Sequence, residues 1–90
     1  VLFEKINDNV VLLRAPTNIS DRYCVPKGVT HIAQNAFEGC LQLNELVIPQ
    51  SVWSIQRGAF VDCPNLSIWG KSGTEAENAA HGHAISFVEI

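Results

Sequence analysis

Apolar side chains recur along the middle of the chain at a fixed spacing, the one that separates Val25 from Ile48 and Phe37 from Phe60, while the residues between them vary freely. A constant period that carries apolar residues is typical of stacked structural repeats, each of which packs only against its neighbours. The pattern therefore predicts two repeats that share one core. The recurring positions are Val25-Pro26, Val29, Ile32, Ala36-Phe37, Cys40 and Leu43, followed by Ile48-Pro49, Val52, Ile55, Ala59-Phe60, Cys63 and Leu66.

Each repeat is predicted to contain one strand and one tight corner. In the segment 45–48, the alternation of side chains directs Leu46 and Ile48 into the core. Pro49 ends this strand because it has no N–H for a further ladder bond. The Ala-Phe-x-x-Cys motif around Phe60 then fits a helical or 3₁₀ turn, in which the small Ala leaves room and the Phe fills the space between repeats.

The flanking segments predict a cap at each end, since two repeats bury too little apolar surface to stand alone. Residues 1–14 alternate around the turn-forming sequence Asn7-Asp8-Asn9, which predicts a β-hairpin. Residues 74–81 predict a short helix, with Thr74 and Glu77 in capping-box register. A final strand is expected at 85–88.

Length and composition fit one compact domain. The chain has 90 residues, of which 47% are hydrophobic, and it has no apolar run long enough to span a bilayer. The formal net charge of −3, without a cluster of basic residues, argues against nucleic acid and anionic membranes as partners. The first residue is Val and the chain contains no signal peptide, so we expect a mature form, a fragment or an excised domain.

Cysteine and histidine residues offer little basis for chemistry. Cys40 and Cys63 occupy the same repeat position, so we expect them to be buried and reduced, whereas Cys24 is an unpaired third thiol. The sequence His81-Gly82-His83 could hold a metal, but a two-residue spacing across a glycine fits an exposed turn better. A nucleophile–base pair of Cys24 and His31 lacks an orienting group. We therefore expect no catalytic residue, no metal site and no cofactor.

The recurring motif I/V-P-x-x-V-x-x-I-x-x-x-A-F-x-x-C-x-x-L resembles the BspA-like leucine-rich repeats, which occur mostly in bacterial proteins. The resemblance covers about residues 10–88, because the lead-in around Tyr23-Cys24-Val25-Pro26 and the segment 66–87 are also similar to the family. It implies a repeat fold that serves as a binding scaffold. It also implies a secreted or cell-surface location.

These observations together predict an α+β fold, namely a short leucine-rich-repeat-type β-solenoid with a β-hairpin N-terminal cap and a helix-plus-strand C-terminal cap. The whole chain, residues 1–90, forms one domain. Its predicted parts are an N-terminal cap at 1–24, repeat 1 at 25–47, repeat 2 at 48–70 and a C-terminal cap at 71–90.

One side chain is the main candidate for binding. Trp53 replaces Thr30 of the preceding repeat and follows the inward Val52, so it is expected to point outward. Exposed aromatic residues are enriched in binding hot spots, although Trp53 folded over the neighbouring cap is the competing interpretation. His31 and Arg57 are predicted to supply polar contacts around it. Trp69 aligns with the inward Leu46 when the repeats are superposed at their fixed period, and it is predicted to lie in the core.

Two hypotheses of function remain open from the sequence. The leading one is a non-catalytic module that binds a protein or a glycan through an outer face, as a monomer and without membrane insertion. The alternative is a structural spacer or terminal cap of a larger bacterial surface protein. A small hydrolase lacks the constellation of residues that it would need.

Overall fold

The protein is described here by a computed structural model that covers residues 1–90. It contains eight strands and one helix, and is therefore an α+β fold. The strands are β1 (Leu2–Ile6), β2 (Asn9–Arg14), β3 (Asp21–Cys24), β4 (His31–Ile32), β5 (Leu43–Val47), β6 (Ser54–Ile55), β7 (Ser67–Gly70) and β8 (Ser86–Glu89); the helix is α1 (Glu75–Gly82).

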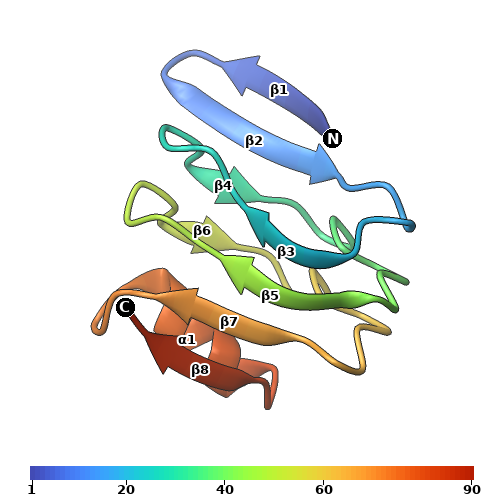
Figure 1. Ribbon diagram of the computed structural model, residues 1–90. Helices are drawn as coiled ribbons and strands as arrows, with labels where there is room; N and C mark the ends of the chain where they lie inside the picture. Colours follow the sequence, from blue (N-terminus) through green and yellow to red (C-terminus); the bar gives the residue numbers. More distant parts are fainter.

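The strands form two four-stranded sheets that enclose the core. The first sheet has the order β1-β2-β4-β6, and the second has the order β3-β5-β7-β8. From β2 to β7 the chain alternates between the sheets, so each repeat adds one parallel strand to each of them. Figure 1 shows the resulting succession of strands from β1 at one end of the molecule to β8 at the other.

The N-terminal hairpin predicted at 1–14 is confirmed. β1 pairs with β2 in antiparallel register, with Ile6 opposite Asn9 across the turn. Asn7 adopts a positive φ of 56°, which Asn tolerates better than most residues and which two-residue hairpin turns require. β2 then pairs with β4, and this pairing ties the hairpin to the first repeat.

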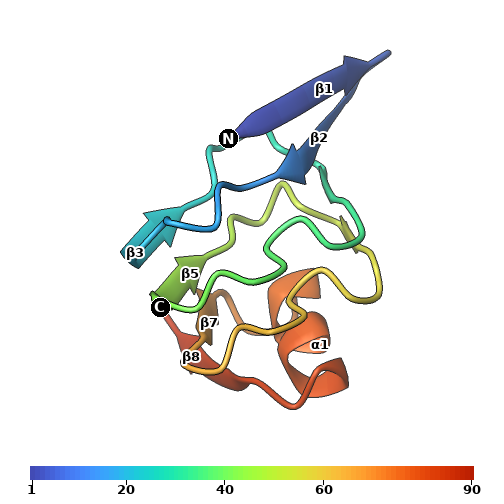
Figure 2. The ribbon, with the colours of Figure 1, turned by 90° about the vertical axis from the view of Figure 1, so that its right-hand side faces the viewer.

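The predicted C-terminal helix and strand are also present, but the capping box is wrong. The Thr74 hydroxyl makes no helix cap and instead donates to the Lys71 carbonyl oxygen at 2.6 Å. Glu77 accepts a hydrogen bond from the backbone N–H of Gly73 at 2.8 Å, one residue before the expected position. The helix contacts β6, β7 and β8, and lies beyond the second repeat at the end of the stack (Figure 2). It is neither long nor apolar enough to cross a membrane.

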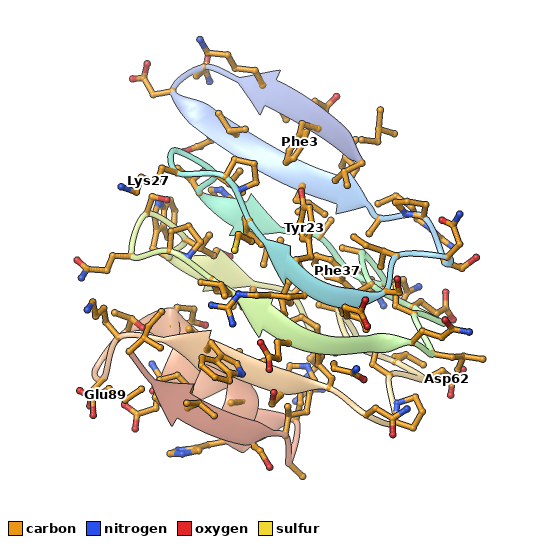
Figure 3. The ribbon with its side chains drawn as sticks, in the orientation of Figure 1. Phe3, Tyr23, Lys27, Phe37, Asp62 and Glu89 are labelled. Atoms are coloured by element: carbon orange, nitrogen blue, oxygen red, sulfur yellow. The ribbon has the colours of Figure 1, made fainter.

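The shared core predicted from the period is confirmed. Phe37 and Phe60 stack with ring centroids 6.0 Å apart, and Phe37 is fully buried. Tyr23 extends this aromatic contact from β3, and Figure 3 shows it beside Phe37. The apolar positions of both repeats are buried or packed against the same cluster, including Leu46, Ile48, Val52, Ile55, Leu66 and their counterparts.

The period of the repeats breaks at one place, and the core assignment of Trp69 is wrong for this reason. Leu43 and Leu66 keep the period, and both are buried. The period matches Leu46 to Trp69, but in the sheet Leu46 pairs with Ile68, one residue earlier. The second repeat is thus one residue shorter between its corner and its strand. Ile68 takes the core position, while Trp69 pairs with Val47 and lies half-buried on the outer face of the second sheet.

Candidate functional site

The candidate site lies where repeats 1 and 2 present Thr30, His31 and Trp53 beside the first sheet. β4 begins at His31, and β6 begins one residue after Trp53. The backbone N–H of Trp53 donates to the Thr30 carbonyl oxygen at 3.0 Å, which fixes the start of the second repeat against the first. The backbone of the site is therefore part of a rigid ladder.

Trp53 and His31 form an aromatic pair on this surface. Their ring centroids are 4.5 Å apart in a T-shaped arrangement, which is a favourable geometry for two aromatic rings. Trp53 is 62% exposed, so contact with His31 leaves most of the indole in solvent. No group within the chain accepts a hydrogen bond from its indole N–H. The pair thus presents an apolar face and an unused donor, as expected of an outward Trp53.

Thr30 orients the imidazole of this aromatic pair. Its hydroxyl lies 2.8 Å from His31 Nδ1 and also donates to the Val10 carbonyl oxygen at 3.1 Å. The same Thr30 oxygen accepts the backbone N–H of Val10 at 2.9 Å. A chain of bonds therefore connects the imidazole to β2, and it limits the rotation of a side chain that the site presents to solvent.

Arg57 is exposed and forms no ion pair or side-chain hydrogen bond within the chain. Its guanidinium is free to meet a partner, but the structure gives it no contact with the aromatic pair. Of the three residues predicted from the sequence, the fold thus brings His31 and Trp53 together, whereas Arg57 makes no hydrogen bond or cation–π contact with either ring.

A second aromatic surface was missed by sequence reasoning. On the outer face of the second sheet, the Arg22 guanidinium lies over the Trp69 ring at 4.9 Å from its centroid and pairs with Glu45 at 2.6 Å. The Trp69 indole N–H donates to the Ser67 hydroxyl at 2.9 Å. Because the groups of Trp69 are engaged within the chain, it is less available to a ligand than Trp53.

The groups considered for chemistry are dispersed. Cys24 lies on β3 of the second sheet and His31 on β4 of the first, and the His31 Nδ1 atom contacts Thr30. His83 bonds through Nδ1 to the Ala79 carbonyl oxygen at 2.7 Å, which anchors its ring to α1. The protein has no group of three or more His, Cys, Asp or Glu side chains arranged to hold a metal ion.

The three cysteines are free thiols, as predicted for Cys40 and Cys63. Cys40 is fully buried, whereas Cys63 is only half-buried and donates to the Phe37 carbonyl oxygen at 2.8 Å. Burial raises the pKa of Cys63 to about 11 and also raises that of Cys40. A thiol with a raised pKa is a poor nucleophile at neutral pH, which supports a packing role for both.

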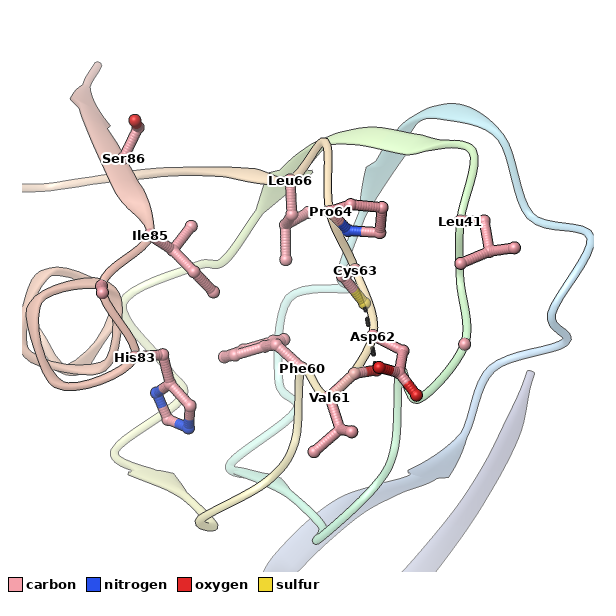
Figure 4. Close-up of a pocket in the computed structure, with 12 residues that line it drawn as sticks. Leu41, Phe60, Val61, Asp62, Cys63, Pro64, Leu66, His83, Ile85 and Ser86 are labelled. Carbon is pink, nitrogen blue, oxygen red and sulfur yellow. Dashed lines mark hydrogen bonds between the residues drawn. The ribbon is translucent and has the colours of Figure 1, made fainter.

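An open groove lies beside the corner of the second repeat. It has a volume of about 960 Å³ and is bounded by residues 60–64 and Leu66, by residues 83–86, and by Gly39 and Leu41. Figure 4 shows Phe60 and Cys63 on one wall and His83 and Ile85 on the other. The imidazole of His83 meets the Phe60 ring edge-on, with centroids 5.2 Å apart, and this contact joins the two walls.

Comparison with known proteins identifies a family and nothing more specific. The family model described as "BspA type Leucine rich repeat region (6 copies)" matches residues 16–72, more than half of the chain. No curated protein and no solved structure matches the chain.

Proposed function

Because the chain belongs to the BspA-type leucine-rich repeat family, we propose that it is a non-catalytic interaction module that binds a protein or a glycan through the surface around Trp53. The observation that carries this proposal is the exposure of Trp53, at 62%, on a backbone fixed by the ladder between the repeats. A large, rigid aromatic side chain loses little conformational entropy on binding and gains much from desolvation.

The polar surroundings suit either class of partner. The Trp53 indole N–H and the His31 ring offer hydrogen bonds to a peptide carbonyl or to a sugar hydroxyl, and the indole face can stack on a sugar ring or an apolar side chain. Arg57 adds a positive charge that can approach the bound partner from the side. The fold serves as a short solenoid that holds these groups in place.

The proposed organisation has two caps around two repeats. Residues 1–24 cover one end of the stack, and residues 71–90 cover the other, where α1 occupies the position of the next strand beside β6. In this account the caps support the binding surface and contribute no ligand contacts. The alternative function is a structural spacer without a ligand of its own. It needs the same caps but gives Trp53 no role in binding.

The two functions are separated by a capture experiment with the isolated domain. The immobilised wild-type protein is presented with a cell-surface protein extract and with a glycan array, in parallel with Trp53→Ala and with Leu2→Ala. Leu2 is a matched control, because it is 60% exposed and lies on β1, outside both the aromatic pair and the groove. Capture that is lost only in Trp53→Ala supports the proposal. Absence of capture by the wild type favours the spacer.

A further inference from the structure

Backbone hydrogen bonds connect the corners of the two repeats in one direction. We use "corner" for residues 35–40 in repeat 1 and 58–63 in repeat 2. The N–H groups of Asn35, Phe37 and Gly39 donate across the stack at 3.1, 2.8 and 2.9 Å. The acceptors are the carbonyl oxygens of Gly58, Ala59 and Val61. The first corner therefore donates to the second, which follows it along the stack.

The second corner repeats the backbone conformation of the first. Asn35 has a φ of 61° and its counterpart Gly58 has 73°, while Gly39 has 75° and its counterpart Asp62 has 59°. A positive φ at the same two positions gives the two corners the same backbone path. The N–H groups of the second corner therefore also point along the stack, away from the first corner. These are the N–H groups of Gly58, Phe60 and Asp62.

None of these three donors has a partner in the chain. The backbone N–H groups of Gly58, Phe60 and Asp62 make no hydrogen bond to the backbone or to a side chain. The helix α1 replaces the next strand beside β6, but no further corner follows the second one. The groove lies in that place, with Phe60 and Asp62 in its wall (Figure 4). Two of the three unpaired donors, those of Phe60 and Asp62, thus belong to the wall of a partly apolar groove, which favours an occupant that brings acceptors.

We propose that this groove docks a peptide segment of a partner protein, which binds as the next corner of the stack. The partner supplies three backbone carbonyl oxygens to the N–H groups of Gly58, Phe60 and Asp62, in the way the second corner supplies them to the first. It also places an aromatic or aliphatic side chain against Leu41 and Val61, the exposed apolar residues of the groove wall. The proposed surface is separate from that of Trp53 and does not depend on it.

The electrostatics of the groove favour a peptide carbonyl over an anion. Rows of backbone N–H groups also bind phosphate, but the groove contains the Asp62 carboxylate and no Lys or Arg. The chain as a whole carries a net charge of −3. A neutral carbonyl oxygen accepts the same hydrogen bonds without this repulsion, and the apolar lining from Leu41, Val61 and Ile85 suits a peptide side chain.

The test is an NMR titration of the full ¹⁵N-labelled chain. The probe is a synthetic peptide of the first corner and its flanks, residues 33–43 with Cys40→Ser, acetylated and amidated at its ends. The amides of Gly58, Phe60 and Asp62 are expected to shift, and their exchange with solvent is expected to slow by about threefold or more. The amides of Asn35, Phe37 and Gly39 serve as internal controls, since they are already bonded and should not respond.

Two variants and two other probes complete the design. Ser86→Trp fills the groove from an exposed position and should abolish the shifts, whereas Trp53→Ala should leave them unchanged. Inorganic phosphate and a scrambled peptide should have no effect on the three amides. The proposal is overturned if the peptide leaves these amides unchanged, if the scrambled peptide acts equally, or if phosphate alone shifts them. Binding that is lost in Trp53→Ala and kept in Ser86→Trp would also overturn it.

Discussion

The two tryptophans differ in the contacts that each makes within the chain. Trp53 has an exposed indole and an unpaired N–H, whereas Trp69 carries the Arg22 guanidinium on its face and bonds to Ser67. Trp53→Ala is therefore expected to leave the free energy of unfolding nearly unchanged. Trp69→Ala should lower it by about 1 to 2 kcal/mol through loss of packing and of the cation–π contact. Urea unfolding of both variants gives the comparison, and a larger loss for Trp53→Ala would contradict the assignment of the exposed surface.

The Cys63 thiol is expected to make the stability of the fold decrease at alkaline pH. Its pKa rises from the model-compound value of 9.0 to about 11 because burial disfavours the thiolate. Between these two values the thiol stays protonated in the folded state but is ionised in the unfolded state. The contribution of the protonated thiol to the free energy of unfolding is therefore fully present below pH 9 and is lost as the pH rises through 11. We expect the urea midpoint to fall across this range in the wild type.

Cys63→Ala is the control for the alkaline transition, because it removes the titrating group from the same site. The fall in urea midpoint between pH 9 and 11 should be smaller in this variant. What remains is expected from Cys40 and Tyr23, because burial also raises the pKa of each of these side chains. An identical pH profile in wild type and variant would show that the thiol does not contribute.

At the scale of elements, Gly70 decides how closely the helix approaches the second sheet. A Cβ atom at Gly70 would lie 2.9 Å from the Ala76 Cβ atom and 3.1 Å from the Ile48 carbonyl oxygen. Gly70→Ala should therefore displace α1 from β7 and lower the free energy of unfolding by about 1 to 3 kcal/mol. The measurement is again urea unfolding, and it tests the proposed role of the helix as part of the C-terminal cap.

Gly82 offers a matched control at the other end of the same helix. A Cβ atom there would meet nothing within 4 Å, so Gly82→Ala should leave stability unchanged or raise it by up to about 1 kcal/mol. If both glycine variants behaved alike, close packing of α1 against β7 would not be important for stability.

Most elements were predictable from the sequence because their signals are local. The hairpin follows from alternation around Asn7-Asp8, and the helix follows from the run between Thr74 and Gly82. The face of Trp69 was not predictable from the period, since the second repeat loses one residue between Leu66 and Ile68 and every side chain after the loss changes face. Only the pairing of β5 with β7 reveals this shift.

At the scale of the whole molecule, the two candidate surfaces differ in whether the sequence alone could reveal them. The Trp53 surface could be inferred from one substitution between repeats, because Thr30 and Trp53 occupy equivalent positions. The groove could not be inferred, because its donors are backbone groups present in every sequence. They become distinctive only when the helix takes the place of a strand and leaves the corner without a successor.

The central claim is that the stacked repeats present Trp53 as the anchor of a binding surface without using it for folding. The most direct measurement is the dissociation constant of the captured partner by isothermal titration calorimetry, for the wild type and for Trp53→Ala, together with the melting temperature of each. We expect the affinity to fall by about tenfold or more, and the melting temperature to stay within about 2 °C. Equal affinities at equal melting temperatures would contradict the claim.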